Sequence, residues 1–299
     1  MRLSPAQKDQ QNRTTLEMVI DESRARVTSS YFLYSFPWWA AALILLGIFI
    51  AISIAADEIY SNIFDQLKDG IAMTLRVAAV SYLCAFAIGL IVGMIRSAPP
   101  RPRPGLMGRI LSLLHLALYN AATFFVMVMR GLPVLIVLLI FAFVIVPAVR
   151  NYLADSLGIQ LELRGSSVES AIIALAFTYG AFLSETFRAG IQSIGRGQVE
   201  AARSLGMNYW QTMRYIVLPQ AIRRVLPPLG NDFVAMIKDS SLVAILGIRD
   251  LTQLAKVSSG ASFRYLETYL TVAFIYLSMT IIGAIVVRYI ERRFSVDNA

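Results

Sequence analysis

The stretch GQVEAARSLGMNYWQTMRYIVLPQA, residues 197–221, is polar, yet long apolar runs lie on both sides of it. Its local signals predict two short helices. Gly206 is suited to the left-handed stop of the first helix. Asn208 and Gln211 have the spacing of a capping box at the start of the second, and Pro219 is predicted to end it. The stretch therefore indicates a folded helix pair inserted between apolar segments.

Apolar residues of this helix pair are spaced to form one face. They are Ala201, Ala202, Leu205, Trp210, Met213 and Val217. Small residues at 201, 202 and 206 permit a close backbone approach to another element. Two interpretations follow from the residues alone: a docking element across the ends of membrane helices, or an amphipathic connector on the membrane surface. A DNA-reading helix-turn-helix is disfavoured, because the loop is too short to present a tethered module.

The composition of the flanking sequence predicts an all-α integral membrane protein. The chain has 299 residues, of which 57% are hydrophobic and 15% charged, and its mean hydropathy is +0.63. A soluble domain is about a quarter charged. The net charge of +8 is attributed to Lys and Arg residues on the cytoplasmic side of membrane spans, and not to nucleic-acid binding.

Six membrane spans are predicted, with both termini in the cytoplasm. They are expected at 37–56, 70–95, within 110–149, and at 168–190, 225–248 and 268–287. The segments 57–69, 150–167 and 249–264 are expected to face outward.

The segment 110–149 is long enough for two spans and carries Arg130 as its only charge. Two crossings would place the next arginine-rich segment outside, against the positive-inside rule. That segment holds Arg188, Arg196, Arg203, Arg214, Arg223 and Arg224. One crossing is therefore predicted, made by an interfacial segment followed by a span that contains Arg130.

Ionisable residues at membrane depth are costly and mark candidate functional sites. Arg130 has two interpretations: a counter-charge for a substrate carboxylate, or a structural partner of Glu185 or of freed backbone carbonyls near Pro133. Glu185 and Arg188 are spaced as an interfacial ion pair. Several polar residues of NDFVAMIKDSSL, residues 231–242, share one span and indicate a discontinuous helix that lines an aqueous path. The candidate substrate-path residues are Arg130, Glu185, Asn231, Lys238, Asp239, Ser240 and Ser241.

The sequence offers no catalytic constellation. His115 is the one histidine and Cys84 the one cysteine, so neither a metal-ligand cluster nor a Ser/His/Asp set is expected. No Gly-x-x-x-x-Gly-Lys-Ser/Thr loop occurs, so the chain itself is not expected to bind ATP. We therefore predict no cofactor or metal in this chain and no enzymatic activity.

The spacing of Glu200-Ala201-Ala202, Gly206 and Leu218-Pro219 resembles the EAA signature of binding-protein-dependent ABC importer permeases. The wider sequence is similar to the branch that imports polar amino acids, through TLRVA (74–78), MRGLPVL (129–135) and AFLSETFRAGIQSI (181–194). The resemblance covers about residues 70–290.

This resemblance implies a type I ABC importer permease fold with a five-helix core. The permease domain would span 70–292, after a cytoplasmic tail (1–36) and an extra transmembrane helix (37–58). The helices at about 197–218 would be coupling helices. The residues that match the coupling motif are Glu200, Ala201, Ala202, Gly206, Leu218 and Pro219.

The resemblance also implies the partners. They are ABC ATPase subunits that bind ATP and Mg, a second permease chain that is identical or homologous, an extracytoplasmic solute-binding protein, and a polar amino acid as substrate. The expected location is the bacterial cytoplasmic membrane. An ion-gradient-driven secondary transporter or channel is the alternative, and a membrane-embedded enzyme is a third class; neither explains the coupling signature.

Overall fold

The computed structural model describes residues 38–160 and 164–294, and every regular element in these ranges is a helix. The chain divides into two compact units, residues 1–53 and 54–299. The first unit contributes most of α2, Trp38–Ala56, which is apolar and has no charged residue. The tail predicted at 1–36 lies outside the described residues. The assignment of α2 as an extra transmembrane helix stays a prediction.

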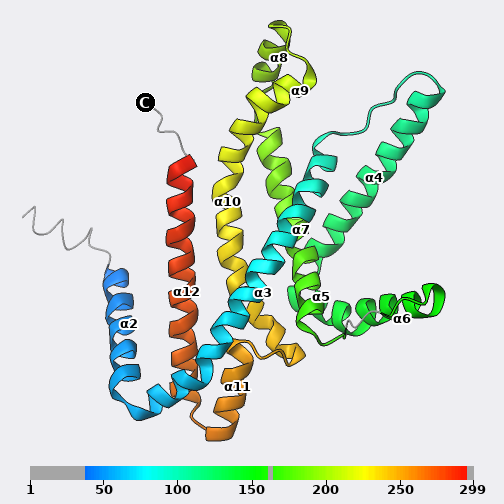
Figure 1. Cartoon of the computed structure of the whole chain (residues 1–299). Helices are drawn as coiled ribbons and strands as arrows, with labels where there is room; N and C mark the ends of the chain where they lie inside the picture. Colours follow the sequence, from blue (N-terminus) through cyan, green and yellow to red (C-terminus); the bar gives the residue numbers. More distant parts are fainter. Residues whose placement is uncertain (1–37, 161–163, 295–299) are drawn as a thin grey trace, which may run out of the picture. The chain divides into compact units, whose positions relative to one another are not determined.

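The second unit is a helical bundle whose elements follow one another through short connections (Figure 1). They are α3 Glu58–Ser97, α4 Leu106–Gly131, α5 Val134–Ile140, η1 Phe141–Ile145, α6 Val146–Leu157, α7 Val168–Gln192, α8 Arg196–Ser204, α9 Tyr209–Thr212, η2 Met213–Val217, α10 Leu218–Asp239, η3 Ser240–Leu246, α11 Leu251–Ser262 and α12 Tyr265–Phe294.

Within the described ranges, five helical segments are long and apolar enough to cross a membrane. They are Glu58–Ser97, Leu106–Gly131, Val134–Leu157, Val168–Gln192 and Tyr265–Arg293. The predicted span at 225–248 is not among them. It comprises the second half of the more polar α10 and the following η3. α10 nevertheless packs antiparallel to α12, since Gly230 lies against Val287 and Gly283 against Ile237. α10 therefore belongs to the same bundle.

α3 is longer than the predicted span, because its helix begins at Glu58 and not at residue 70. The carboxylate of Asp57 caps this start by accepting hydrogen bonds from the backbone N–H groups of Ile59 (2.8 Å) and Tyr60 (3.4 Å). The other two segments expected to face outward also hold helices, α6 and α11. A capping aspartate thus starts α3 at Asp57 and α11 at Asp250, whereas α6 continues directly from η1 without a side-chain cap.

α3 and α7 form the centre of the unit and run parallel. A Cβ placed on Gly89 would lie 2.7 Å from the Cβ of Leu183, and one on Gly93 would lie 2.8 Å from the Cβ of Phe187. The residue numbers rise together along both helices, so their carboxyl ends lie at the same end of the bundle. Because α8 and α9 follow α7, we call this the α8–α9 end. Since α3 and α7 run in the same direction, the chain between them must cross the bundle once, net, in the opposite direction. This confirms the single crossing predicted for residues 110–149.

The same segment shows that one detail of the prediction was wrong. Residues 110–149 form two long helical segments, α4 and α5–η1–α6, instead of an interfacial segment and one span. The break lies at Leu132, whose backbone is extended (φ −99°, ψ 142°), and Pro133 precedes α5. A residue before proline is pushed out of the helical region by steric contact with the proline ring, which explains the break.

The prediction that Pro219 ends a helix was also wrong. α9, η2 and α10 follow one another without a gap from Tyr209 to Asp239. Pro219 lies in the first turn of α10, directly after the π-helical turn η2. Within a continuous helix a proline lacks one backbone N–H donor and its ring meets the carbonyl of the preceding turn, and a local π-helical turn is one adjustment that accommodates it. The interruption predicted for 225–248 occurs only after Asp239, where the helix changes from α to 3-10.

The close α3–α7 contact gives a prediction for folding. Gly89→Val is expected to lower the amount of folded protein in the membrane severalfold, because overpacking a tight contact costs about 1–3 kcal/mol. Gly131→Val serves as the matched control, since a Cβ at that position meets nothing within 4 Å. Fluorescence-detected gel filtration of both tagged variants checks this. Equal monodisperse peaks for the two variants would contradict the tight packing.

Candidate functional site

The turn after α8 has the hydrogen bonds of a Schellman motif. The N–H of Met207 donates to the carbonyl of Ala202 (3.1 Å), and the N–H of Gly206 donates to the carbonyl of Arg203 (2.9 Å). Gly206 has φ +80°, in the left-handed region that only glycine adopts without strain. The predicted stop of the first helix is therefore confirmed.

The start of α9 is closed by the predicted capping box. The backbone N–H of Gln211 donates to Oδ1 of Asn208, and Oε1 of Gln211 accepts from the N–H of Asn208, both at 2.9 Å. The Schellman turn and the capping box follow each other directly, so the connection between α8 and α9 is a rigid corner.

The single apolar face expected for this helix pair is divided between two sides. Ala202 and Val217 are buried, and Val217 packs in a cluster with Ile194 and Ala221. On the opposite side, the side chain of Leu205 is 84% exposed. Trp210 is 77% exposed. The corner at Gly206 turns α9 relative to α8, so one set of apolar side chains packs inward and the other faces outward.

The residues of the coupling motif are divided in the same way. Ala202 is buried, while the other members are exposed at the surface of the helix pair. The exposed members are Glu200, Ala201, Gly206, Leu218 and Pro219. The outward surface of the corner thus carries Glu200 and Leu205 beside a glycine without a side chain.

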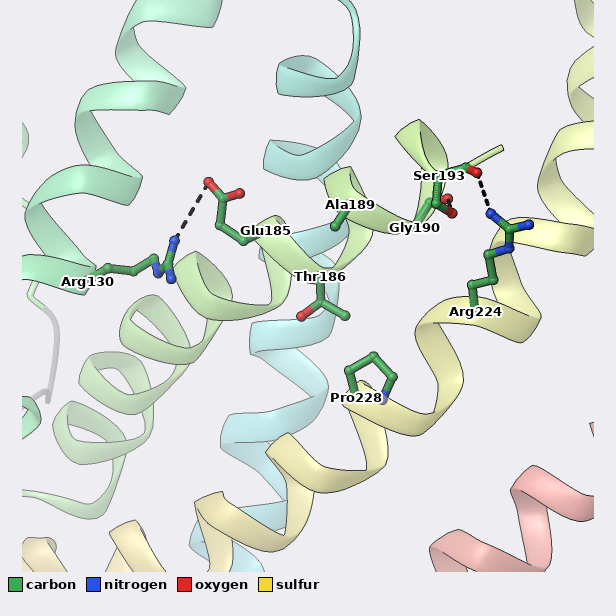
Figure 2. A pocket seen from close by; sticks show the side chains of 8 residues that line it. All are labelled: Arg130, Glu185, Thr186, Ala189, Gly190, Ser193, Arg224 and Pro228. Carbon is green, nitrogen blue, oxygen red and sulfur yellow. Dashed lines mark hydrogen bonds and ion pairs between the residues drawn. The ribbon is translucent and has the colours of Figure 1, made fainter. Parts of the chain in front are cut away.

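A cavity of about 520 Å³ lies between α4, α7 and α10 (Figure 2). We call it the central cavity. Its lining is Arg130, Glu185, Thr186, Ala189, Gly190, Ser193, Arg224 and Pro228. It contains two of the predicted substrate-path residues, Arg130 and Glu185. Arg224 extends along its far side and donates a hydrogen bond to the backbone carbonyl of Ser193.

Glu185 is the centre of an ion cluster that joins α3, α4 and α7. Its Oε1 accepts from Nη1 of Arg96, and its Oε2 accepts from Nη2 (2.6 Å) and Nε (2.9 Å) of Arg188. Nη1 of Arg130 lies 3.9 Å from Oε1. The side chain of Glu185 is 18% exposed, so the cluster is largely shielded from water. The predicted pairing of Glu185 with Arg188 is confirmed.

Arg96 was missing from the predicted cluster. In the sequence it reads as an ordinary flanking arginine at the end of a span. Only the parallel packing of α3 on α7 places it beside Glu185. The available signal was a basic residue in the last turn of one span and an acidic residue near the end of another. This signal did not specify which helices are neighbours.

Arg130 is the surplus cation of this cluster. One carboxylate faces three guanidinium groups, and its two oxygens are already engaged by Arg96 and Arg188. The Arg130 side chain is 46% exposed and its guanidinium carbon lies 5.7 Å from the centre of the Phe182 ring. The cluster therefore presents a net positive charge to the central cavity, within a membrane-spanning part of the fold.

The predicted polar residues of α10 and of the start of η3 lie elsewhere. Oδ2 of Asp239 accepts a hydrogen bond from the hydroxyl of Tyr179 (2.8 Å), and the buried Ser240 donates to the carbonyl of Ile237 (2.8 Å). Asn231 and Lys238 are exposed and Ser241 is half-buried. None of these residues lines the central cavity. The structure thus separates the predicted substrate-path residues into two groups, and Tyr179 was not predicted.

Comparison with known proteins identifies the family. Residues 105–296 match the family described as binding-protein-dependent transport system inner membrane component. The chain belongs to this family. The match covers more than half of the chain, so this is an integral component of an inner membrane, a permease subunit of an ABC importer.

Individual relatives and a solved structure support this family assignment. The permease is 34% identical over 232 residues to the probable amino-acid ABC transporter permease protein YckA of Bacillus subtilis (strain 168), covering 78% of this chain and 90% of that protein. It is 32% identical over 230 residues to the glutamine transport system permease protein GlnP of Escherichia coli (strain K12), covering 77% and 93%. The crystal structure of an amino acid ABC transporter with histidines matches with a TM-score of 0.60 and 31% identity, over 77% of this chain and 94% of that one.

These matches confirm the predicted type I ABC importer permease fold and the transport role, and they favour no ion-gradient-driven mechanism. The family consists of transport components, so the permease is not an enzyme. Membership implies an ATPase, a solute-binding protein and a second permease as partners.

Proposed function

We propose that this permease imports polar amino acids into the cytoplasm by ATP-driven alternating access. The support is that relatives with amino-acid transport in their names cover about three quarters of the chain, among them glutamine permeases. A partner ATPase would bind ATP and Mg, a solute-binding protein outside the membrane would deliver the amino acid, and a second permease chain, identical or homologous, would complete the path.

The observation that carries the coupling mechanism is the unbroken helical run from Tyr209 to Asp239. A groove of the ATPase would hold the corner formed by α8 and α9. Because no loop separates α9 from α10, a displacement of the corner moves α10 as a lever. α10 contacts α7 and α12, so closure of the motor would reach the centre of the bundle.

This mechanism fixes the orientation. The α8–α9 end would face the cytoplasm, where the ATPase is, and both termini would lie on that side. Several arginines lie near this end, among them Arg96, Arg188 and Arg224. Their position on the proposed cytoplasmic side agrees with the positive-inside rule.

The substrate path would pass the central cavity, where Arg130 would meet the carboxylate that all amino acids carry. Glu185 is engaged by Arg96 and Arg188, so a substrate carboxylate is the natural counter-charge for the remaining guanidinium. Tyr179 and Asp239 on α7 and α10 would line a second part of the path.

Arg130→Gln is expected to lower the transport rate at saturating amino acid about tenfold or more, because a hydrogen bond to a charged group contributes about 1.5–3 kcal/mol. The Michaelis constant should change less, since the solute-binding protein sets it. Arg130→Lys, which keeps the charge, should retain more of the rate. Uptake of labelled amino acid into proteoliposomes checks this; a wild-type rate for Arg130→Gln would remove Arg130 from the substrate path.

A further inference from the structure

A second cavity lies at the α8–α9 end, where the connection between α3 and α4 folds back on α4. We call it the loop cavity. It has a volume of about 730 Å³. Arg101 and Arg103 from the connection and His115 from α4 line it, together with Ser97, Leu111 and Ser112. It is separate from the central cavity and has no part in the proposed transport path.

The charge of the loop cavity is entirely positive. No acidic residue within 38–160 or 164–294 lines it, and the sequence holds no Asp or Glu from residue 70 to residue 154. Within the described part of the chain, Arg101 and Arg103 form no ion pair. The nearest basic neighbours in the sequence, Arg96 and Arg109, add to the same charge. Two guanidinium groups and an imidazole thus line the cavity without a counter-charge from the described residues.

The connection that carries the two arginines is held in place. Oγ of Ser112 accepts a hydrogen bond from the N–H of Arg103 (3.1 Å) and lies within donor distance of the carbonyls of Arg101 (3.1 Å) and Gly108 (2.8 Å). A Cβ on Gly108 would lie only 3.0 Å from the Cβ of Arg103, so the connection packs directly on the first turn of α4. The prolines at 99, 100, 102 and 104 restrict the backbone further. The arginines are therefore presented by a preorganised segment.

An apolar surface continues from the cavity along α4. Leu111 belongs to the cavity lining, and Leu114 and Leu118 follow it at helical spacing; all three side chains are exposed. α4 is among the helices long and apolar enough to cross a membrane. The cavity thus lies where a membrane-spanning helix begins, with cationic groups beside the start of an apolar surface.

We propose that the loop cavity binds the phosphate of an anionic phospholipid, with the acyl chains along Leu111, Leu114 and Leu118 of α4. The planar guanidinium groups of Arg101 and Arg103 would hold the phosphate oxygens through paired, charge-assisted hydrogen bonds. The ring N–H of His115 would supply a further donor. Basic pockets between helices at the cytoplasmic side of a membrane favour anionic headgroups, and here the adjoining apolar surface favours a lipid over a soluble phosphate.

The test measures lipid binding to the purified full-length permease in detergent. Native mass spectrometry would count adducts of short-chain phosphatidylglycerol, with zwitterionic phosphatidylcholine of equal chain length as the comparison. The wild type should retain phosphatidylglycerol preferentially. Each of the single variants R101Q and R103Q should weaken its binding about fivefold, and R101Q/R103Q about 25-fold, since one basic residue near an anionic lipid contributes about that factor. Gel filtration verifies that each variant is folded.

Arg109→Gln is the matched control, because it removes one positive charge from the same region but does not line the cavity. It should weaken binding less than R101Q or R103Q does, because Arg109 adds to the local field but donates no hydrogen bond to the phosphate. An equal loss in R109Q and R103Q would show a diffuse charge effect and overturn the site. Equal binding of phosphatidylcholine would exclude recognition of the anion. If inorganic phosphate at matched concentration displaced the lipid, the loop cavity would be a site for free phosphate. That result would overturn the proposal that its ligand is a lipid. None of these outcomes depends on transport, so the proposal stands or falls apart from the proposed function.

Discussion

Gly206→Asp is expected to lower ATP-dependent uptake by at least about 100-fold, because an unpaired charge buried in an interface costs about 3–5 kcal/mol and each 1.4 kcal/mol is tenfold. The permease itself should still fold and insert. A Cβ at position 206 meets nothing within 4 Å in this chain, and aspartate tolerates the left-handed conformation better than most residues. The damage would therefore arise where the corner enters the ATPase. Uptake per molecule of permease in proteoliposomes measures it.

Gly206→Asn separates charge from conformation. Asparagine has nearly the same size and adopts the left-handed region with similar ease, but it adds no charge. It should retain at least about a tenth of the wild-type uptake. If both variants transported normally, the corner would not be inserted in a partner. If both were absent from the membrane, Gly206 would be required for folding and the coupling role would lose its support.

Glu185→Gln is expected to destabilise the permease by about 3 kcal/mol, the lower end of the cost of breaking a buried ion pair, since Glu185 keeps partial exposure. The substitution keeps the shape of the side chain but leaves the guanidinium groups of Arg96, Arg188 and Arg130 facing one another without an anion. For a domain of this size the midpoint of thermal unfolding should fall by roughly 6–12 °C. A thermal unfolding scan of the purified permease in detergent measures this.

Two further variants identify the cause. Arg130→Gln removes the surplus cation and should leave the unfolding midpoint within about 2 °C of the wild type. Adding Arg96→Met to Glu185→Gln removes one of the unpaired charges and should restore part of the loss. An unfolding midpoint for Glu185→Gln equal to that of the wild type would show that the cluster does not stabilise the helix packing.

The local structure of the helix pair could be predicted because its signals are local. Gly206, Asn208 and Gln211 act within a few residues of one another, and the structure shows the left-handed stop and the capping box at those positions. Pro219 misled the prediction, because a π-helical turn before it allows the helix to continue. A π turn depends on the packing of the whole element and has no short sequence signature.

The ion cluster and the cavity depend on which helices are neighbours. The net single crossing between α3 and α7 followed from charge asymmetry, but the partnership of Arg96 with Glu185 required their parallel contact through Gly89 and Gly93. Hydropathy likewise identified membrane segments without showing that residues 110–149 break at Leu132. The burial of Ser240 and the exposure of Lys238 cannot be read from a pattern in which both residues are polar.

The most direct test of the central claim is amino-acid uptake by the complete transporter. The permease, reconstituted in proteoliposomes with its ATPase and solute-binding protein, would be given labelled glutamine and other polar amino acids with ATP inside, outside or absent. The account predicts uptake only when ATP is available to the ATPase, and ATP hydrolysis that rises when the loaded solute-binding protein is added. Uptake that continues at full rate without ATP, driven by an ion gradient alone, would contradict it.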